Sequence, residues 1–250
     1  MSRLRIFAEV LSRRTLLSPE DGRTLLDLWV RALPSYIPDR IGNSEPVRIP
    51  FDAANIDAAV RTWGWPFLAT RRNPSVDSQV WMPKGLATHG VWYFATDLSP
   101  TTAQDQIARL AGDVAVVLDA DFACVTVLTP SEIDDGRRTD TVSALDVHGK
   151  RWNFFIPSHF LRQRLPDVYW RTLFGPGYVR AFGRDRLLAT PVHAVEEIKD
   201  SIALQLTPDM RDLERDPAGF RRIKRQIKEY LGRDAFASPA AGIGAASHIH

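Results

Sequence analysis

The sequence predicts an α+β domain, in which an antiparallel sheet with hairpins has about four capped helices packed on it. Three observations support this fold class: short runs rich in β-branched and aromatic residues, two connections short enough for hairpins, and four segments with helix start and stop signals. Because the helices do not alternate regularly with the strands, a doubly wound parallel sheet is not expected.

Each predicted helix combines a capping residue, apolar residues at helical spacing and a proline or glycine at its end. A serine or an aspartate begins each segment, and in three of them a proline occupies the first helical position. The four segments run from Ser18 to Pro34, from Asp52 to Gly64, from Ser99 to Gly112 and from Asp216 to Gly232.

Between these helices, runs of strand-forming residues predict nine strands. Two pairs are joined by short polar connections, 147–151 and 198–201, which are typical of antiparallel hairpins. The first fourteen residues are interpreted as an amphipathic element, because Glu9 interrupts their apolar centre. The nine predicted strands are 66–70, 79–82, 91–95, 114–118, 124–128, 142–147, 152–156, 195–198 and 202–206.

We expect one α+β domain over residues 1–237, a length that a single core can serve. The polar run 134–140 is interpreted as a surface loop, and it is also the joint if the chain forms two similar lobes, 1–135 and 140–237. Residues 238–250 are rich in alanine, glycine and serine and are expected to form a flexible tail.

Composition narrows the function classes. Lysine and arginine number 32 and aspartate and glutamate 30, and the two signs are interspersed, which argues against a dedicated nucleic-acid-binding protein. Cys124 is the single cysteine, so no intramolecular disulfide can form and the cytoplasm is the expected location. The N-terminal apolar stretch is too short for a signal-peptide core or a membrane span, and no membrane association is expected.

No motif in the sequence predicts a catalytic centre, a cofactor site or a metal site. His248 and His250 have ligand spacing but lack a third ligand nearby, and Asp119 and Asp121 are interpreted as a solvated turn rather than a magnesium site. Cys124 lies in an apolar run, which is typical of a buried thiol. The other histidines, each isolated in the sequence, are His89, His148, His159 and His193.

The fourth predicted helix carries a basic face opposite its apolar stripe. A solvated amphipathic face accounts for this pattern, and binding of a phosphate backbone or an acidic partner is the alternative. No aromatic residue interleaves the cations, which weakens the nucleic-acid alternative. The basic residues are Arg221, Arg222, Lys224, Arg225 and Lys228.

The run from Tyr169 to Gly183, Y-W-R-T-L-F-G-P-G-Y-V-R-A-F-G, is interpreted as a packed turn whose aromatic rings belong to the core. Together with the following V-E-E-I-K-D-S-I-A-L-Q-L-T it resembles bacterial immunity proteins of polymorphic toxin and type VI secretion systems, most of all the immunity protein 52 group. The resemblance covers Asp146 to Phe236. In that group an aromatic F-G-P-x-Y-like segment precedes a small helix and a hairpin ending in L-x-L-T.

This resemblance implies a non-enzymatic cytoplasmic protein that binds a cognate toxin and blocks it by occlusion. It does not indicate which residues contact the toxin or the oligomeric state. Two alternatives stay open: a hydrolase that uses Asp119, Asp121 and a distant histidine, and a structural adaptor of a secretion apparatus. Convergence of those side chains in one deep pocket would favour the enzyme.

Overall fold

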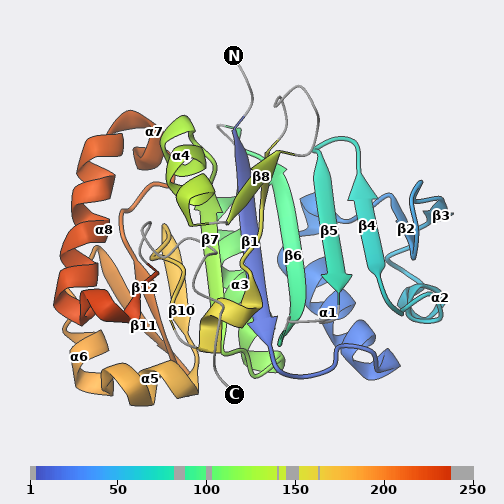
Figure 1. Ribbon diagram of the computed structural model, residues 1–250. Coiled ribbons are helices and arrows are strands. Elements are labelled where there is room, and N and C mark those ends of the chain that lie inside the picture. The colour runs from blue at the N-terminus through green and yellow to red at the C-terminus, as the bar shows by residue number, and fades with distance from the viewer. Residues whose placement is uncertain are drawn as a thin grey trace, which may run out of the picture.

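The computed structural model describes residues 4–81, 88–99, 103–139, 141–144, 152–162 and 164–237. Within these ranges the chain forms a ten-stranded sheet and a two-stranded sheet, with eight α-helices where about four were expected (Figure 1). Neighbouring strands of both sheets run antiparallel, which confirms the α+β class.

The strands of the large sheet, in their order across it, are β11 (Ala194–Ile198), β12 (Ser201–Gln205), β10 (Arg171–Phe174), β7 (Phe122–Val127), β1 (Arg5–Ser12), β6 (Gly90–Asp97), β5 (Val76–Trp81), β4 (Phe67–Arg71), β2 (Arg40–Gly42) and β3 (Ile49–Pro50). The small sheet pairs β8 (Val142–Ala144) with β9 (Trp152–Phe154). The helices are α1 (Pro19–Ala32), α2 (Ile56–Val60), α3 (Gln104–Val117), α4 (Pro130–Arg138), α5 (Pro176–Phe182), α6 (Arg184–Leu188), α7 (Asp212–Arg215) and α8 (Pro217–Leu231).

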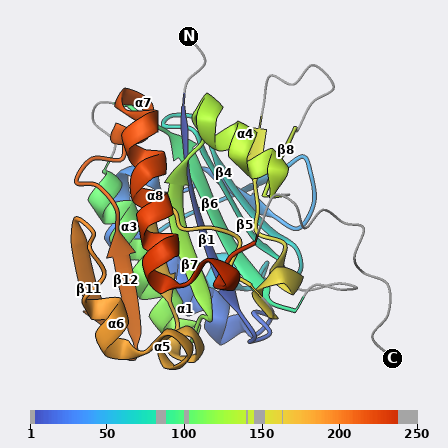
Figure 2. The same ribbon diagram turned by 60° about the vertical axis from the view of Figure 1, so that its left-hand side comes forward.

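Different elements cover the two faces of the large sheet. α1 and α3 lie behind it in the view of Figure 1, where Trp29 of α1 packs edge-on against Phe94 of β6 at a ring-centroid distance of 5.7 Å. β8 and α4 lie in front, and Figure 2 shows α8 passing in front of β12 and β7. The core therefore extends on both sides of the central strands.

β1 is the central strand and pairs with β6 on one side and β7 on the other. Seven of its eight residues are buried, including Glu9. The predicted amphipathic character of this segment is therefore wrong, because neither face of β1 meets solvent. The Glu9 carboxylate instead accepts a hydrogen bond of 2.8 Å from the backbone N–H of Ile156 in the front layer.

Two predicted helices have the expected ends. Ser18 caps α1 and Asp216 caps α8, each by accepting a hydrogen bond from the backbone N–H three residues later. α2 begins later than predicted, with Asn55 as its N-cap. The physical reason is that Asp52 accepts a hydrogen bond from Ala54 N and forms a turn ahead of the helix.

α3 differs more from the prediction. The expected start at Ser99 is wrong, because the helix begins after Ala103, and the expected stop at Gly112 and the strand at 114–118 are also wrong. Gly112 packs against Ile198 of β11, and the apolar stripe continues past it at helical spacing. The buried residues of this stripe are Ile107, Ala108, Leu110, Ala111, Val114 and Ala115.

The polar run 134–140, predicted as a surface loop, is helical up to Arg138, while residue 140 lies outside the described ranges. Thr129 caps this helix by accepting a hydrogen bond of 3.2 Å from Glu132 N, and Pro130 occupies its first position. Strands from before and after the run share one sheet, since β7 pairs with β10. The division into two lobes stays a prediction.

Eight of the nine predicted strands are present with small shifts at their ends, and 114–118 is the exception. The hairpin at 198–201 joins β11 to β12 as predicted. The predicted hairpin connection 147–151 and the predicted tail 238–250 lie outside the described residues. β1, β2, β3 and β10 were not predicted as strands.

The aromatic run forms β10 and α5 rather than a turn alone. Tyr169, Trp170 and Phe174 are buried, which confirms their interpretation as core residues, and the Trp170 indole N–H donates to Thr207 O over 3.0 Å. Gly175 joins the two elements at a close approach of backbones. A Cβ atom there would lie 2.0 Å from the carbonyl oxygen of the neighbouring α3–β7 turn, so only glycine fits.

Candidate functional site

A cavity of about 350 Å³ opens between α4, α8 and the residues that follow α8. In the described part of the chain its walls carry six basic and two acidic side chains. We refer to it as the basic cavity. Its lining residues are Asp135, Arg138, Thr139, Asp167, Arg221, Lys224, Arg225, Lys228, Arg233, Phe236 and Ala237.

The inner face of α8 is apolar except at one position. Phe220, Ile227 and Leu231 are buried there. Lys224 lies four residues after Phe220 and three before Ile227, so it shares this face and is 6% exposed. The interpretation of the basic residues as a wholly solvated face is therefore wrong for Lys224. Those that are exposed as expected are Arg221, Arg222 and Arg225.

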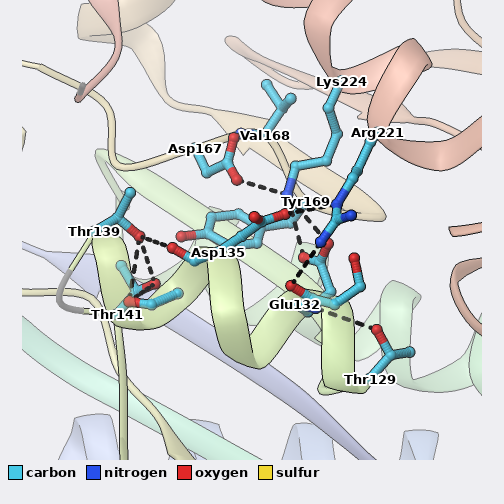
Figure 3. A network of polar contacts seen from close by, with 12 residues as sticks. Thr129, Glu132, Asp135, Thr139, Thr141, Asp167, Val168, Tyr169, Arg221 and Lys224 are labelled. Atoms are coloured by element: carbon cyan, nitrogen blue, oxygen red, sulfur yellow. Dashed lines mark hydrogen bonds and ion pairs between the residues drawn. The ribbon is translucent and has the colours of Figure 1, made fainter. Parts of the chain in front are cut away.

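Lys224 forms a buried ion network with two carboxylates (Figure 3). Its Nζ lies 2.6 Å from Asp167 Oδ2 and 3.2 Å from Glu132 Oε2. Asp167 also pairs with Lys228. The Lys224 ammonium lies 6.0 Å from the centroid of the Tyr169 ring, within the range of a cation–π contact. α8 is thereby tied to α4 and to the segment before β10.

Burial and pairing act in opposite directions on the pKa values of this network. Burial opposes charge on Lys224, but Asp167 and Glu132 outweigh it and raise the pKa of the lysine. Burial also opposes ionisation of Asp167, yet the two lysines beside it lower its pKa. Glu132 is paired with Lys224 alone, so burial prevails and its pKa is raised. Lys224 and Asp167 are thus the charged centre of the network.

α4 supplies the acidic wall of the basic cavity. Asp135 pairs with Arg221 of α8 at 3.1 Å and with Arg138 of its own helix at 3.9 Å. Glu132, one turn earlier on α4, faces Lys224 as described above. Because two of these contacts cross from α4 to α8, they fix the distance between the helices and hold the cations at the inner wall in place.

The outer cations are less neutralised than the inner ones. Arg225 is exposed and has no ion-pair partner among the described residues. The side chain of Arg138 is 67% exposed and its pair with Asp135 is long. Arg233 is 68% exposed and pairs with Glu229 one turn earlier. The basic cavity therefore presents net positive charge to solvent.

A buried hydroxyl lies in a small chamber beside the basic cavity. Tyr169 is 3% exposed, and its Oη has no hydrogen-bond partner in the described ranges. The tyrosine lines a chamber of about 10 Å³ that shares Asp135, Thr139 and Asp167 with the basic cavity. Burial raises the pKa of this phenol well above its ordinary value, so the group stays protonated and able to donate.

Of the sequence candidates, His89 and Asp121 meet, and we refer to them with Arg13 as the histidine clamp. His89 Nε2 lies 3.0 Å from Asp121 Oδ2, and its Nδ1 lies 2.7 Å from Thr88 Oγ1. The hydrogen bond from His89, with help from Arg13 and against burial, lowers the pKa of Asp121. Asp119 does not join them, since it is exposed in the α3–β7 turn with a φ of 49°.

None of the remaining candidates in the described ranges joins the histidine clamp or lines the basic cavity. Cys124 is buried, as predicted, and burial followed by the nearby Glu9 raises the pKa of its thiol. His159 and His193 are exposed. His148, His248 and His250 lie outside the described residues.

The described ranges contain neither a cluster of metal-binding side chains nor a membrane-spanning helix. They hold no group of three or more histidine, cysteine, aspartate or glutamate side chains close enough to bind one metal ion. None of their helices is both long and apolar enough to span a bilayer.

Sequence reasoning named Lys224 only as part of the basic face and did not name Glu132 or Asp167, although Lys224 and Glu132 had a local signal. Lys224 occupies the apolar spacing of α8, which marks a buried charge that needs partners. Thr129 to Glu132 reads T-P-S-E, the pattern of a capping box at a helix start. Asp167 has no such signal, because its role depends on the packing of α8 against it.

Comparisons with known proteins find a similar fold but identify no family. No family model matches the sequence, and no curated protein matches it. Among solved structures, the fold is similar to that of Pseudomonas aeruginosa T6SS protein PA0821, where T6SS denotes the type VI secretion system. The TM-score is 0.55 and the identity 14%, over 95% of this chain and 74% of that chain. At this identity the likeness concerns the fold alone.

Proposed function

We propose that this chain is an immunity protein that binds a toxin effector of a type VI secretion system and blocks it by occlusion. The observation that carries the proposal is the fold shared over 95% of this chain with a type VI secretion protein. The resemblance of the second half to the immunity protein 52 group points in the same direction. Such a protein would act in the cytoplasm, without a reaction of its own.

The basic cavity supports binding rather than chemistry. Its inner cations are held by ion pairs between α4 and α8, so they form a surface that is ready before a partner arrives. Binding to such a surface costs little side-chain entropy. In this proposal the cavity and the outer arginines around it form the toxin-facing surface.

The histidine clamp is the observation that favours the alternative, a hydrolase. A general base must reach the proton that it abstracts. The His89 side chain is 1% exposed, and both of its ring nitrogens lie within hydrogen-bonding distance of Thr88 or Asp121. We therefore favour a structural role for the clamp, in which it ties the end of β1 and the start of β6 to the α3–β7 turn.

Co-expression tests the proposal. Each toxin encoded next to the gene of this chain would be expressed in a sensitive host, with and without the chain. We expect one of them to arrest growth alone and to be tolerated with the chain, and the two purified proteins to co-elute in size-exclusion chromatography. If the chain protects against none of the neighbouring toxins, the proposal is wrong.

Asp121→Asn separates binding from catalysis in the same assay. Because this variant alters the histidine clamp and leaves the basic cavity intact, a binding protein should protect as well as the wild type does. Loss of protection by a folded variant that still co-elutes with the toxin would support the hydrolase instead.

A further inference from the structure

We infer that the basic cavity recognises carboxylate side chains on an acidic segment of the partner protein. This inference rests on the proposed function and names the chemistry of the partner. The first supporting observation is the charge of the cavity, whose described walls carry six basic and two acidic side chains. An anionic partner is steered toward such a surface, and a cationic one is repelled.

The arrangement of the cations suits carboxylates. Arg138 and Arg225 stand at the outer wall with little or no pairing, and Arg221 is held by Asp135 further in. A guanidinium group binds a carboxylate with two parallel hydrogen bonds, which fixes its orientation as well as its position. Arginines on two helices can therefore each receive an acidic side chain.

The same walls disfavour a nucleic acid. Sequence-tolerant binding of single strands needs aromatic faces for stacking. The aromatic rings at this site, Phe236 and Tyr169, are 2% and 3% exposed.

Residues 238–250, which follow the cavity in the sequence, supply no acidic side chain. Ala237, the residue before them, lines the cavity. A second protein with acidic side chains is therefore the occupant that matches the charge of this surface.

Fluorescence anisotropy with a labelled hexaglutamate peptide tests the inference. The peptide would be titrated with the wild type, with the double variant Arg138→Glu and Arg225→Glu, and with the double variant Arg180→Glu and Arg222→Glu as the control of equal charge change. Arg180 on α5 and Arg222 on α8 are exposed and do not line the cavity. We expect the double variant to weaken binding at least about tenfold, as for the loss of a charged hydrogen bond, and the control to change it less than about twofold.

Equal weakening by the control would mean that the peptide senses net charge rather than the cavity, and would overturn the inference. So would an oligothymidylate that binds more tightly than the peptide and is lost in the double variant, because it would assign the cavity to a nucleic acid. Thermal melting of each variant shows that the fold is retained.

Failure of the inference differs from failure of the proposed function. If the wild type protects against a toxin and the double variant protects equally well, the protein is an immunity protein that binds through another surface. If the wild type protects against none, the proposed function is wrong, and the peptide titration still decides whether the cavity binds carboxylates.

Discussion

Two buried carboxylates in front of the large sheet, Asp167 and Glu9, respond to burial in opposite ways. Asp167 lies between Lys224 and Lys228, and its pKa is lowered although burial opposes this. Glu9 accepts one hydrogen bond, from Ile156 N, and burial raises its pKa well above the ordinary value. Burial thus raises the pKa of an acid unless cations accompany it. The charged form is favoured at the basic cavity and disfavoured at the sheet centre.

A substitution in the apolar core should have the largest effect on stability, and the effects of the charged groups are compared with it. Trp170, next to Tyr169, is fully buried, and Trp170→Ala is expected to lower the free energy of unfolding by about 3 to 5 kcal/mol through the cavity it leaves. Urea unfolding followed by circular dichroism measures the loss. Leu17→Ala is the control, since that side chain is 47% exposed and should cost under about 0.5 kcal/mol. Equal losses would place the indole outside the core.

Removal of Lys224 from the buried ion network should give the second largest loss of unfolding free energy. Lys224→Met leaves Glu132 without its cation, and we expect a loss of about 3 kcal/mol, at the lower end for a broken buried pair because Asp167 keeps Lys228. Adding Glu132→Gln should recover part of it. Arg222→Met on the same helix serves as the control. If Lys224→Met were as stable as the wild type, the network would not differ from a surface ion pair.

Glu9→Gln tests whether burial raises the pKa of Glu9. A folded-state pKa above the unfolded value gives stability that is fully present below about pH 4.3 and is lost as the pH rises through the folded pKa. The wild type should therefore become progressively less stable relative to Glu9→Gln, which does not ionise, as the pH rises above about pH 4.3. At the acid end the variant should cost about 1 kcal/mol. Parallel stability profiles of the two proteins would show that Glu9 is charged in the fold.

The histidine clamp should give an effect as small as that of Glu9, with the opposite pH dependence. The pKa of Asp121 is lowered, so its contribution is present above about pH 3.9 and is lost as the pH falls through the folded pKa. Asp121→Asn should cost about 1 kcal/mol at neutral pH, as for one ordinary hydrogen bond, and less in acid. Denaturant midpoints from about pH 3 to pH 7 provide the measurement. A constant difference across that range would rule out this linkage.

Local signals predicted the fold class and most strands, and failed where packing overrides them. Glycine commonly ends a helix, so Gly112 was expected to end this one. α3 nevertheless continues to Val117, because the apolar stripe on both sides of Gly112 is buried and Gly112 itself lies beside Ile198. A glutamate usually indicates a solvent-exposed face, yet β1 is covered on both sides and Glu9 is buried. A residue's chemistry alone does not show how many layers will cover it.

The candidate site was harder to predict than the fold, because it depends on contacts between distant segments. The basic residues of α8 were recognised, but not that Lys224 lies inside. Its partners are Asp167, which has no local pattern, and Glu132 of α4, a helix that was not predicted and whose second half was interpreted as a loop. A charge on an apolar stripe indicates such a site in the sequence, but the sequence does not show which distant residues pair with it.

The central place of β1 also governs the order in which the protein can form during synthesis. Arg5 pairs with Asp97, and Ile6 pairs with both Thr96 and Val127, so this apolar strand emerges long before either neighbour exists. Pairings so distant along the chain slow folding and leave an aggregation-prone segment exposed meanwhile. Fragments that end before β7 should therefore be retained by chaperones or precipitate, whereas those that include it can complete both sides of β1.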